Sequence, residues 1–337
     1  MSKVSLKDLA KVLNISVSSV SKSLRDSHEI AEETKKNVRA LAIEMGYSPN
    51  PYAGFLRNQK SKTIAVIVPE LTNNFFIQAI SGAESVAQEH DYNILIYTTN
   101  DTYEKEKRIL NHLSNRRVDG VIISLASTTN EYNHLTNLIE VGIPIVFFDR
   151  ICHEIETAKI TTNDFASGFT ATEHLISNGC KKIAYLSISK NLSIDHKRNQ
   201  GYFEALNKYD IKIDDSMIIN CSNDDKSNQH KIKSLLKSNN KPDGIFASIE
   251  RLALNTYNVC NELNIKIPED LKVISFSNLR TASLLNPSLT TITQPAFEMG
   301  KESAKILFKY LSKKNYIISN EHIVLKSELS IRNSTKK

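Results

Sequence analysis

The chain has 337 residues, of which 40% are hydrophobic and 24% are charged, as in an ordinary globular protein. Its longest apolar runs, such as IAVIV and IPIVFF, are too short to cross a bilayer, and MSKVSLKDLA lacks the apolar core of a signal peptide. The four cysteines (Cys152, Cys180, Cys221 and Cys260) lie far apart, which disfavours a disulfide framework and a metal site. We therefore expect a cytoplasmic protein with no bound metal, no cofactor and no membrane partner.

The positive charge is concentrated at the N-terminal end. Residues 1–60 contain ten Lys and Arg against six Asp and Glu, a balance of +4, and the rest of the chain contains 33 against 31, a balance of +2. A basic segment on a nearly neutral body suits a polyanion such as DNA. A charged, solvated surface would have the same composition.

Residues 1–48 show no strand pattern and predict three short amphipathic helices. In the first, apolar residues follow helical spacing from Leu6 to Leu13, behind a capping box formed by Ser5 and Asp8. This arrangement predicts one apolar face that packs on the other two helices.

The second helix is short and rich in serine. Ser16 is its expected cap, and Val17, Val20 and Leu24 are expected to face inward. At about 100° per residue, the opposite side presents short hydroxyls and two cations, namely Ser18, Ser21, Lys22 and Arg25. Such a face after a tight turn at residues 13–15 is typical of a helix-turn-helix that enters the major groove of DNA. An ordinary three-helix bundle with one polar face is the alternative.

The third helix and the segment after it have readable signals. Glu32 and Glu33 suit the positive end of the helix dipole, and Gly46 can end the helix. Ala31 occupies the expected capping position without a side-chain acceptor, which weakens the start by about 1 kcal/mol. Pro51 can open a short helix at residues 49–60, although this polar segment taken alone reads as a linker.

From Thr63 onward the pattern is that of an α/β protein. Apolar runs of strand length alternate with amphipathic segments of helix length at residues 63–149 and again at residues 182–276. This alternation predicts parallel, doubly wound sheets covered on both faces. Because the units are too many for one core, we expect two lobes, formed by residues 61–162 plus 293–320 and by residues 163–292 plus 321–337.

Polar and aromatic residues follow the strands, at the ends where ligands bind in open parallel sheets. They are Asn73, Phe75 and Phe76 after the first strand, Asp149 and Arg150 after the fourth, Asp164 after the crossover strand, and Arg198 at the start of a helix. Carboxylates and arginines suit the vicinal hydroxyls of a sugar, and an aromatic ring suits its apolar face. A surface ion pair or a core position is the alternative for each residue taken alone.

Several runs, in order, make the sequence similar to the LacI/GalR family of bacterial transcriptional regulators over nearly its whole length. They include VSLKDLAKVLNISVSSVSKSL, RRVDGVII, ATEHLISNGCKKIAYLS and LTTITQPAFEMGKESA. The resemblance implies a helix-turn-helix head at 1–48, a hinge at 49–60 and a core like the periplasmic sugar-binding proteins at 61–337. It also implies a homodimer that binds a pseudo-palindromic double-stranded DNA operator under the control of a small-molecule effector, with a sugar or sugar derivative favoured.

Carried over by position, the resemblance implies roles in DNA binding. The bases would be approached by Leu6, Val17, Ser18 and Lys22, and the phosphates by Ser5, Ser16, Ser19, Ser21 and Arg25. Lys22 replaces the usual Arg, so a point charge replaces a forked grip on guanine. In the hinge, Leu56 would wedge into the minor groove with Ala53 beside it. Gly54 replaces another usual Arg and lowers helix propensity by about 1 kcal/mol.

The resemblance also implies an effector site, with departures from the family pattern. Its contacts would come from Asn73, Phe75, Phe76, Asp149, Asp164, Arg198, Glu250 and Asn278. Ile249 and Glu250 stand where an Asn-Asp pair is common, and Ser277 and Asn278 stand where two acidic residues are common. These differences leave the identity of the effector open.

No catalytic site is predicted. The sequence has no GxGxxG, P-loop or GxSxG motif and only 10 glycines, and no His–Cys or His–carboxylate grouping has catalytic spacing. A solute-binding protein, or a sugar-processing enzyme on the same core, is the alternative, although the N-terminal head and the missing signal peptide disfavour export. The ending RNSTKK lacks a heptad repeat, so we expect a dimer built through the core rather than a tetramer.

Overall fold

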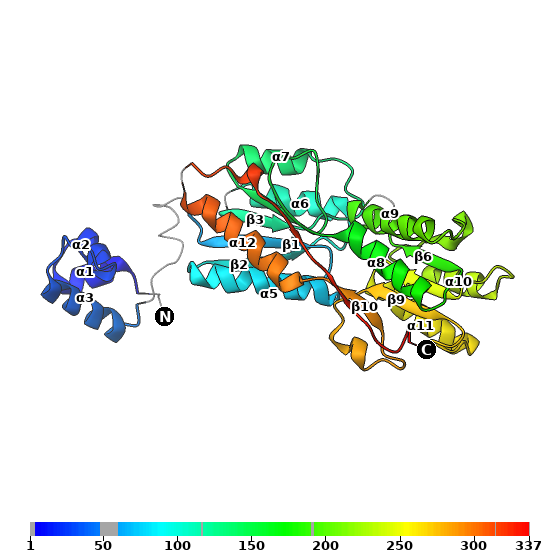
Figure 1. Cartoon of the computed structure of the whole chain (residues 1–337). Coiled ribbons are helices and arrows are strands. Elements are labelled where there is room, and N and C mark those ends of the chain that lie inside the picture. Colours follow the sequence, from blue (N-terminus) through cyan, green and yellow to red (C-terminus); the bar gives the residue numbers. More distant parts are fainter. Residues whose placement is uncertain (1–3, 48–59, 116, 190–191, 314, 337) are drawn as a thin grey trace. The chain divides into compact units, whose positions relative to one another are not determined.

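A computed structural model of the chain describes residues 4–47 and 60–336, apart from residues 116, 190, 191 and 314 (Figure 1). The chain divides into two compact units, Met1–Ser61 and Lys62–Lys337, and each unit is described by itself. Within the described residues, no helix combines the length and the apolar character needed to span a membrane.

The N-terminal unit is a bundle of three helices, α1 (Leu6–Leu13), α2 (Val17–Leu24) and α3 (Glu32–Glu44). Each helix contributes one fully buried residue to the centre of the bundle, namely Leu9, Val20 and Val38. The predicted capping box is confirmed, because Ser5 Oγ accepts the Asp8 amide at 3.4 Å and the Asp8 carboxylate accepts the Ser5 amide at 2.8 Å.

The other helix ends of the head also follow the sequence. Asn14 adopts a left-handed conformation with φ 52°, which makes the turn between α1 and α2 tight. Ser16 Oγ accepts the Ser19 amide at 3.0 Å and caps α2 as predicted. Ala31 makes no side-chain bond at the start of α3, and Gly46, with φ 66°, follows its end.

The core consists of two α/β lobes, each built on a six-stranded sheet. The first sheet has the order β11-β5-β4-β3-β1-β2, and all its strands are parallel. Its strands are β1 (Thr63–Val68), β2 (Asn93–Thr98), β3 (Gly120–Ile123), β4 (Ile145–Phe148), β5 (Ala158–Thr162) and β11 (His322–Leu325). The helices of this lobe are α5 (Asn74–Glu89), α6 (Tyr103–Leu113), α7 (Asn133–Glu140) and α12 (Ala296–Ser312).

The second sheet repeats this plan in the order β12-β10-β9-β8-β6-β7, with only β12 antiparallel to its neighbour. Its strands are β6 (Ile183–Ser187), β7 (Ile218–Asn220), β8 (Gly244–Ala247), β9 (Lys272–Phe276), β10 (Thr290–Thr293) and β12 (Glu328–Ser330). Its helices are α8 (Asp164–Ser177), α9 (Ser193–Lys208), α10 (Asp225–Lys237) and α11 (Glu250–Leu263). The prediction of two doubly wound lobes is confirmed.

One lobe boundary differs from the expectation. The pattern assigns residues 321–337 to the second lobe, but β11 pairs with β5 in the first sheet, and only β12 lies in the second. The reason is that Ile323 and Leu325 pack on the core of the first lobe while Val324 between them is exposed, as in a half-buried edge strand. The last crossover therefore follows β11 (the red segment in Figure 1).

Each lobe contains one pair of helices whose backbones touch. A Cβ atom at Gly300 would lie 1.8 Å from the backbone oxygen of Ala79, so α12 and α5 meet where only glycine fits. A Cβ atom at Gly168 would lie 2.3 Å from the backbone oxygen of Arg198, so α8 and α9 meet in the same way. The second contact positions Arg198, which lines the cavity described next.

Candidate functional site

A cavity of about 500 Å³ lies between the two lobes, at the carboxyl ends of β1 and β4 in one sheet and of β8 and β9 in the other. This volume and position suit a small molecule. The predicted residues that line it are Asn73, Phe75, Phe76, Asp149, Arg198, Glu250 and Asn278. Asp164 does not line the cavity and lies behind Arg198.

Arg198 is held from several sides. Its Nε donates to Asp164 Oδ1 at 2.8 Å, and its Nη1 donates to the Ser248 carbonyl oxygen at 2.8 Å. Its guanidinium carbon lies 3.7 Å from the centre of the Phe276 ring. Burial favours the neutral form, but Asp164 and Asp149 outweigh it and keep the pKa of Arg198 above its ordinary value. Arg198 is thus a fixed cation at the cavity wall.

The expectation that Arg198 opens a helix is wrong. Helix α9 begins at Ser193, so Arg198 lies in its second turn. The first turn is anchored through buried Asp195, which accepts hydrogen bonds from the Tyr185 hydroxyl at 2.9 Å and from the Ser187 hydroxyl. These bonds come from strand β6 and depend on tertiary contact, which explains why local periodicity did not mark the helix start.

Asp149 follows β4 in a left-handed conformation with φ 59°, which costs a non-glycine residue about 1–3 kcal/mol. Its side chain is buried, and burial raises the pKa of the carboxyl group, while Arg198 and Arg150 oppose the shift. Backbone strain and a buried carboxyl at a cavity wall are both typical of a binding site.

The start of α5 supplies the aromatic part of the cavity. Asn73 caps this helix, because its Oδ1 accepts the Phe75 amide at 2.9 Å. Phe75 and Phe76 lie edge to face with their centroids 5.2 Å apart, and Phe75 also stacks on Phe148 at 6.5 Å. The cap therefore fixes the point at which two rings enter the cavity.

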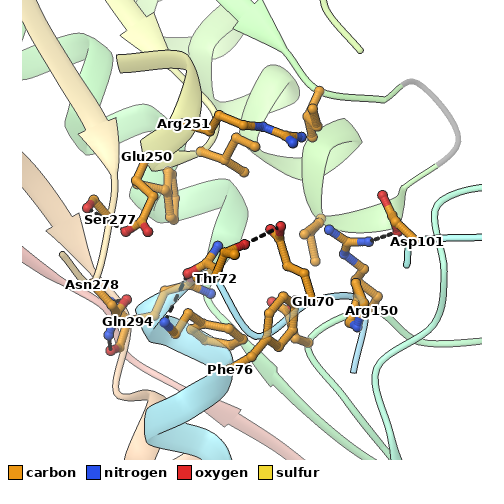
Figure 2. Close-up of a pocket in the computed structure, with 18 of the residues that line it drawn as sticks. Glu70, Thr72, Phe76, Asp101, Arg150, Glu250, Arg251, Ser277, Asn278 and Gln294 are labelled. Carbon is orange, nitrogen blue, oxygen red and sulfur yellow. Dashed lines mark hydrogen bonds and ion pairs between the residues drawn. The ribbon is translucent and has the colours of Figure 1, made fainter. Parts of the chain in front are cut away.

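The sequence pattern missed a chain of hydrogen bonds that joins the lobes beside the cavity, which we call the interlobe chain (Arg150, Asp101, Asn223 and Arg251). Arg150 Nη1 donates to Asp101 Oδ1 at 2.6 Å (Figure 2), and Asn223 Nδ2 donates to Asp101 Oδ2 at 3.0 Å. Arg251 Nη2 then donates to Asn223 Oδ1 at 2.6 Å. Burial opposes ionisation of Asp101, but Arg150 and the bonds from Asn223 hold its pKa below the ordinary value.

The two sequence departures noted for the effector site also reach the cavity. Glu250 opens α11 and is 8% exposed, and its Oε2 accepts the Ser277 hydroxyl at 2.9 Å. Burial raises the pKa of the Glu250 carboxyl, and the bond from Ser277 opposes the shift. Asn278 Nδ2 donates to the Gln294 carbonyl oxygen at 2.7 Å, at the second crossover between the lobes.

In the head, α2 presents a polar face that differs from the expectation at one position. Val17 is 40% exposed and does not face inward, whereas Ser23 is fully buried and donates to the Ser19 carbonyl oxygen at 2.8 Å. A small hydroxyl that bonds back to its own helix can be buried at little cost. The exposed Val17 is thereby free to contact another surface.

The two cations of α2 are both engaged within the head. Lys22 Nζ pairs with the Glu29 carboxylate. Arg25 lies back along its helix, where Nε and Nη2 donate to the carbonyl and hydroxyl oxygens of Ser21, each at 2.9 Å. The hinge candidates Ala53, Gly54 and Leu56 lie outside the described residues.

A helix-turn-helix head on a two-lobed core with a ligand-sized cavity defines a ligand-responsive DNA-binding regulator. Comparison with known families agrees, because residues 5–50 match the bacterial regulatory proteins of the lacI family. Residues 61–327 match the periplasmic binding proteins and sugar binding domain of the LacI family. The chain therefore belongs to the LacI family, and it is a DNA-binding transcriptional regulator.

Individual relatives support this assignment. The chain is 32% identical to the HTH-type transcriptional regulator RegA of Clostridium saccharobutylicum, over 98% of this chain and 99% of that protein. The structure of a LacI family transcriptional regulator from Enterococcus faecium with bound ribose is 30% identical, with a TM-score of 0.71 over 81% of this chain and 98% of the other. The lac repressor dimer bound to operator and an anti-inducer matches in fold, with a TM-score of 0.83 and 20% identity over 100% of both chains.

Proposed function

We propose that this regulator binds its operator as a homodimer in the cytoplasm, and that a small polyhydroxylated effector in the cavity controls this binding. The observation that carries the proposal is the convergence of Asp149, Arg198 and the ring of Phe75 on one cavity between two lobes. Charged groups and an aromatic ring in this arrangement suit the hydroxyls and the apolar face of a sugar. The ribose-bound relative from Enterococcus faecium has the same fold and provides further support.

The effector contacts in this proposal come from seven predicted residues and one supporting residue. The contacts are Asn73, Phe75, Phe76, Asp149, Arg198, Glu250 and Asn278. Asp164 acts through Arg198, because it accepts the Nε–H of that side chain and does not reach the cavity.

The effector is tested by a thermal-shift screen of sugars and sugar derivatives, followed by calorimetry on the compounds that stabilise the protein. Asp149→Ala should abolish the effect of such a compound on operator binding and leave the operator affinity of the free protein near normal. Undiminished binding of the compound to the Asp149→Ala, Arg198→Ala double variant would refute this site.

The DNA contacts are proposed for the exposed face of the head and for the hinge. Bases are assigned to Leu6, Val17, Ser18 and Lys22, phosphates to Ser5, Ser16, Ser19, Ser21 and Arg25, and the minor-groove wedge to Leu56 with Ala53. Lys22 must exchange the Glu29 carboxylate for a base, and Arg25 must release Ser21 before it can reach a phosphate. Both rearrangements involve half-buried or exposed side chains and cost little.

This assignment predicts different responses from the two cations. Lys22→Ala should weaken operator binding by about 1–3 kcal/mol with little change on random DNA, because a base contact carries sequence information. Arg25→Ala should weaken both and reduce the salt slope by about one unit, as expected for a phosphate contact. Fluorescence anisotropy at several salt concentrations measures both effects, and equal losses on the two DNAs for Lys22→Ala would make it a backbone contact.

The dimer is proposed to form through the first lobe. Strand β2 is an edge of its sheet, and Leu95 and Ile96 on it are 40% and 47% exposed. Leu71 and Ile77, which follow β1, are each 45% exposed. An exposed apolar edge strand is a natural pairing surface for a second copy. Light scattering should show a dimer, and Ile96→Lys should shift it toward monomer, whereas an unchanged dimer would exclude this edge.

A further inference from the structure

Each arginine that lines the cavity already has a carboxylate of its own. The pairs are Arg150 with Asp101 at 2.6 Å, Arg198 with Asp164 at 2.8 Å, and Arg251 with Asp225 at 3.9 Å. Arg198 and Arg251 are further occupied by the carbonyl oxygen of Ser248 and the amide oxygen of Asn223. An anionic ligand would therefore find no guanidinium that lacks a partner at this cavity, within the residues that the structure describes.

The carboxylates of the cavity are in the opposite situation. Within the described part of the chain, Glu70, Asp149 and Glu250 have no Lys, Arg or His nitrogen within 4.0 Å. Glu70 accepts only a hydroxyl bond among those shown, from Thr72 at 2.8 Å, and Asp149 feels Arg198 and Arg150 from a longer distance. These three groups bring negative charge to the cavity without a matching cation in contact.

The two glutamates come from different lobes and face the same space. Glu70 follows β1 in the first lobe, and Glu250 opens α11 in the second. Figure 2 shows both carboxylates pointing into the cavity, with Thr72 between them. Burial raises the pKa of Glu250, and the charge of Glu70 adds to this shift, so the two groups interact electrostatically.

The sum of charges has the same sign. Four carboxylates line the cavity (Glu70, Asp101, Asp149 and Glu250) against three guanidinium groups (Arg150, Arg198 and Arg251), which gives 3 − 4 = −1. The partners Asp164 and Asp225 behind this layer lower the balance to −3. In a buried site of low dielectric constant, this excess repels an anion and attracts a cation more strongly than it would in water.

We propose that the effector is a polyhydroxylated compound with a protonated amine, such as an amino sugar, whose ammonium group binds between Glu70 and Glu250. Its hydroxyls meet Asp149 and Arg198, as in the proposed function on which this inference rests. The rings of Phe75 and Phe76 add a favourable surface for a cation. A phosphorylated sugar is excluded by the same charges.

The experiment compares matched compounds that differ only in charge. Glucose, galactose and mannose are each tested beside their 2-amino and 6-phosphate forms, by thermal shift and then by calorimetry on the full-length protein. At least one amino form should bind about tenfold or more tightly than its neutral counterpart, as expected for a hydrogen bond between charged groups. A neutral or phosphorylated form that binds best, or no binding by any amino form, overturns the proposal.

Two variants test the assigned carboxylates. Glu250→Gln removes the charge at nearly constant size and should erase the preference for the amine, but it also disturbs the bond with Ser277. Glu70→Gln is the second variant, because this half-buried side chain loses little else. Glu204→Gln, on the exposed side of α9, is the matched control and should keep the full preference. A preference that persists in both cavity variants overturns the assignment.

Operator binding separates this inference from the proposed function. If a neutral sugar changes operator affinity and the amino sugars do not, the regulatory function stands and the charge assignment falls. If an amino sugar binds in a Glu70-dependent way but leaves operator affinity unchanged, the ligand class stands and effector control falls. Fluorescence anisotropy with labelled operator distinguishes the two results.

Discussion

In the first lobe, α5 and α12 pack through Gly82 and Gly300, and in the second lobe, α8 and α9 pack through Gly168 and Gly201. The first pair joins helices from distant parts of the chain and lies beside the large apolar core of its lobe. The second pair joins consecutive helices, and its closest contact is the backbone of Arg198, whose side chain reaches the cavity. The same packing device thus holds a lobe together in one case and aims a binding residue in the other.

The largest expected effect comes from filling these two contacts. Gly300→Ala should lower the free energy of unfolding by about 3 kcal/mol, because its Cβ would lie 1.8 Å from the Ala79 oxygen and the helices must separate. Gly168→Ala should cost a similar amount, but it should also weaken effector binding at least tenfold by displacing Arg198. Urea denaturation and calorimetry measure the two quantities.

Gly142 provides the control for this pair. No atom lies within 4 Å of a Cβ at this position, although its φ of 85° disfavours alanine, so Gly142→Ala should cost only about 1 kcal/mol. Normal effector binding by folded Gly168→Ala would show that the second helix pair is merely structural, and the contrast between the lobes would disappear.

A smaller effect is expected from Asp164→Asn, which keeps the size of the side chain and removes its charge. The buried bond to Arg198 should lose about 2 kcal/mol, and effector binding should fall because Arg198 is no longer fixed. Asp225→Asn is the matched substitution at the more exposed pair with Arg251 and should change stability by less than about 0.5 kcal/mol. Equal losses in the two variants would contradict the special role of the second lobe's helix pair.

The smallest effect concerns the interlobe chain. Asn223→Ala removes the bond to Asp101 and the acceptor for Arg251, so it should shift the lobes toward an open arrangement by about 1 kcal/mol. Effector affinity should then fall about fivefold. Small-angle X-ray scattering should show a larger radius of gyration than in the wild type without effector and an equal radius at saturation. A radius that matches the wild type in both states would rule out a closing role.

The parts of the structure that the sequence predicts are those governed by local rules. Helix caps depend on a few adjacent residues, and the Ser5–Asp8 box, the Ser16 cap and the end of α3 at Gly46 are all confirmed. The buried parallel strands are equally legible, because they are short, apolar and separated by amphipathic segments. The position of Asn73, Asp149 and their neighbours at the cavity follows from the rule that strand ends carry ligands.

The parts that it does not predict depend on contact between distant residues. The exposure of Val17 follows from how α2 lies on the other two helices, and the start of α9 follows from bonds to β6. The interlobe chain joins residues 101, 150, 223 and 251, and their proximity exists only once the lobes are side by side. Asp101 alone offered a local signal, because it follows β2 as Asp149 follows β4.

The last crossover has a consequence for synthesis of the protein on the ribosome. Strand β11 completes the first sheet, and Ser334 completes the second lobe, where its amide and carbonyl bond to Ser288 and Val273 at 2.8 and 3.0 Å. The head is finished by residue 47, so a nascent chain carries a folded DNA-binding bundle long before either sensor lobe can close. A product truncated before residue 322 leaves β5 and β10 as unpaired edges, which makes it a substrate for chaperones and proteases rather than a regulator that ignores its effector.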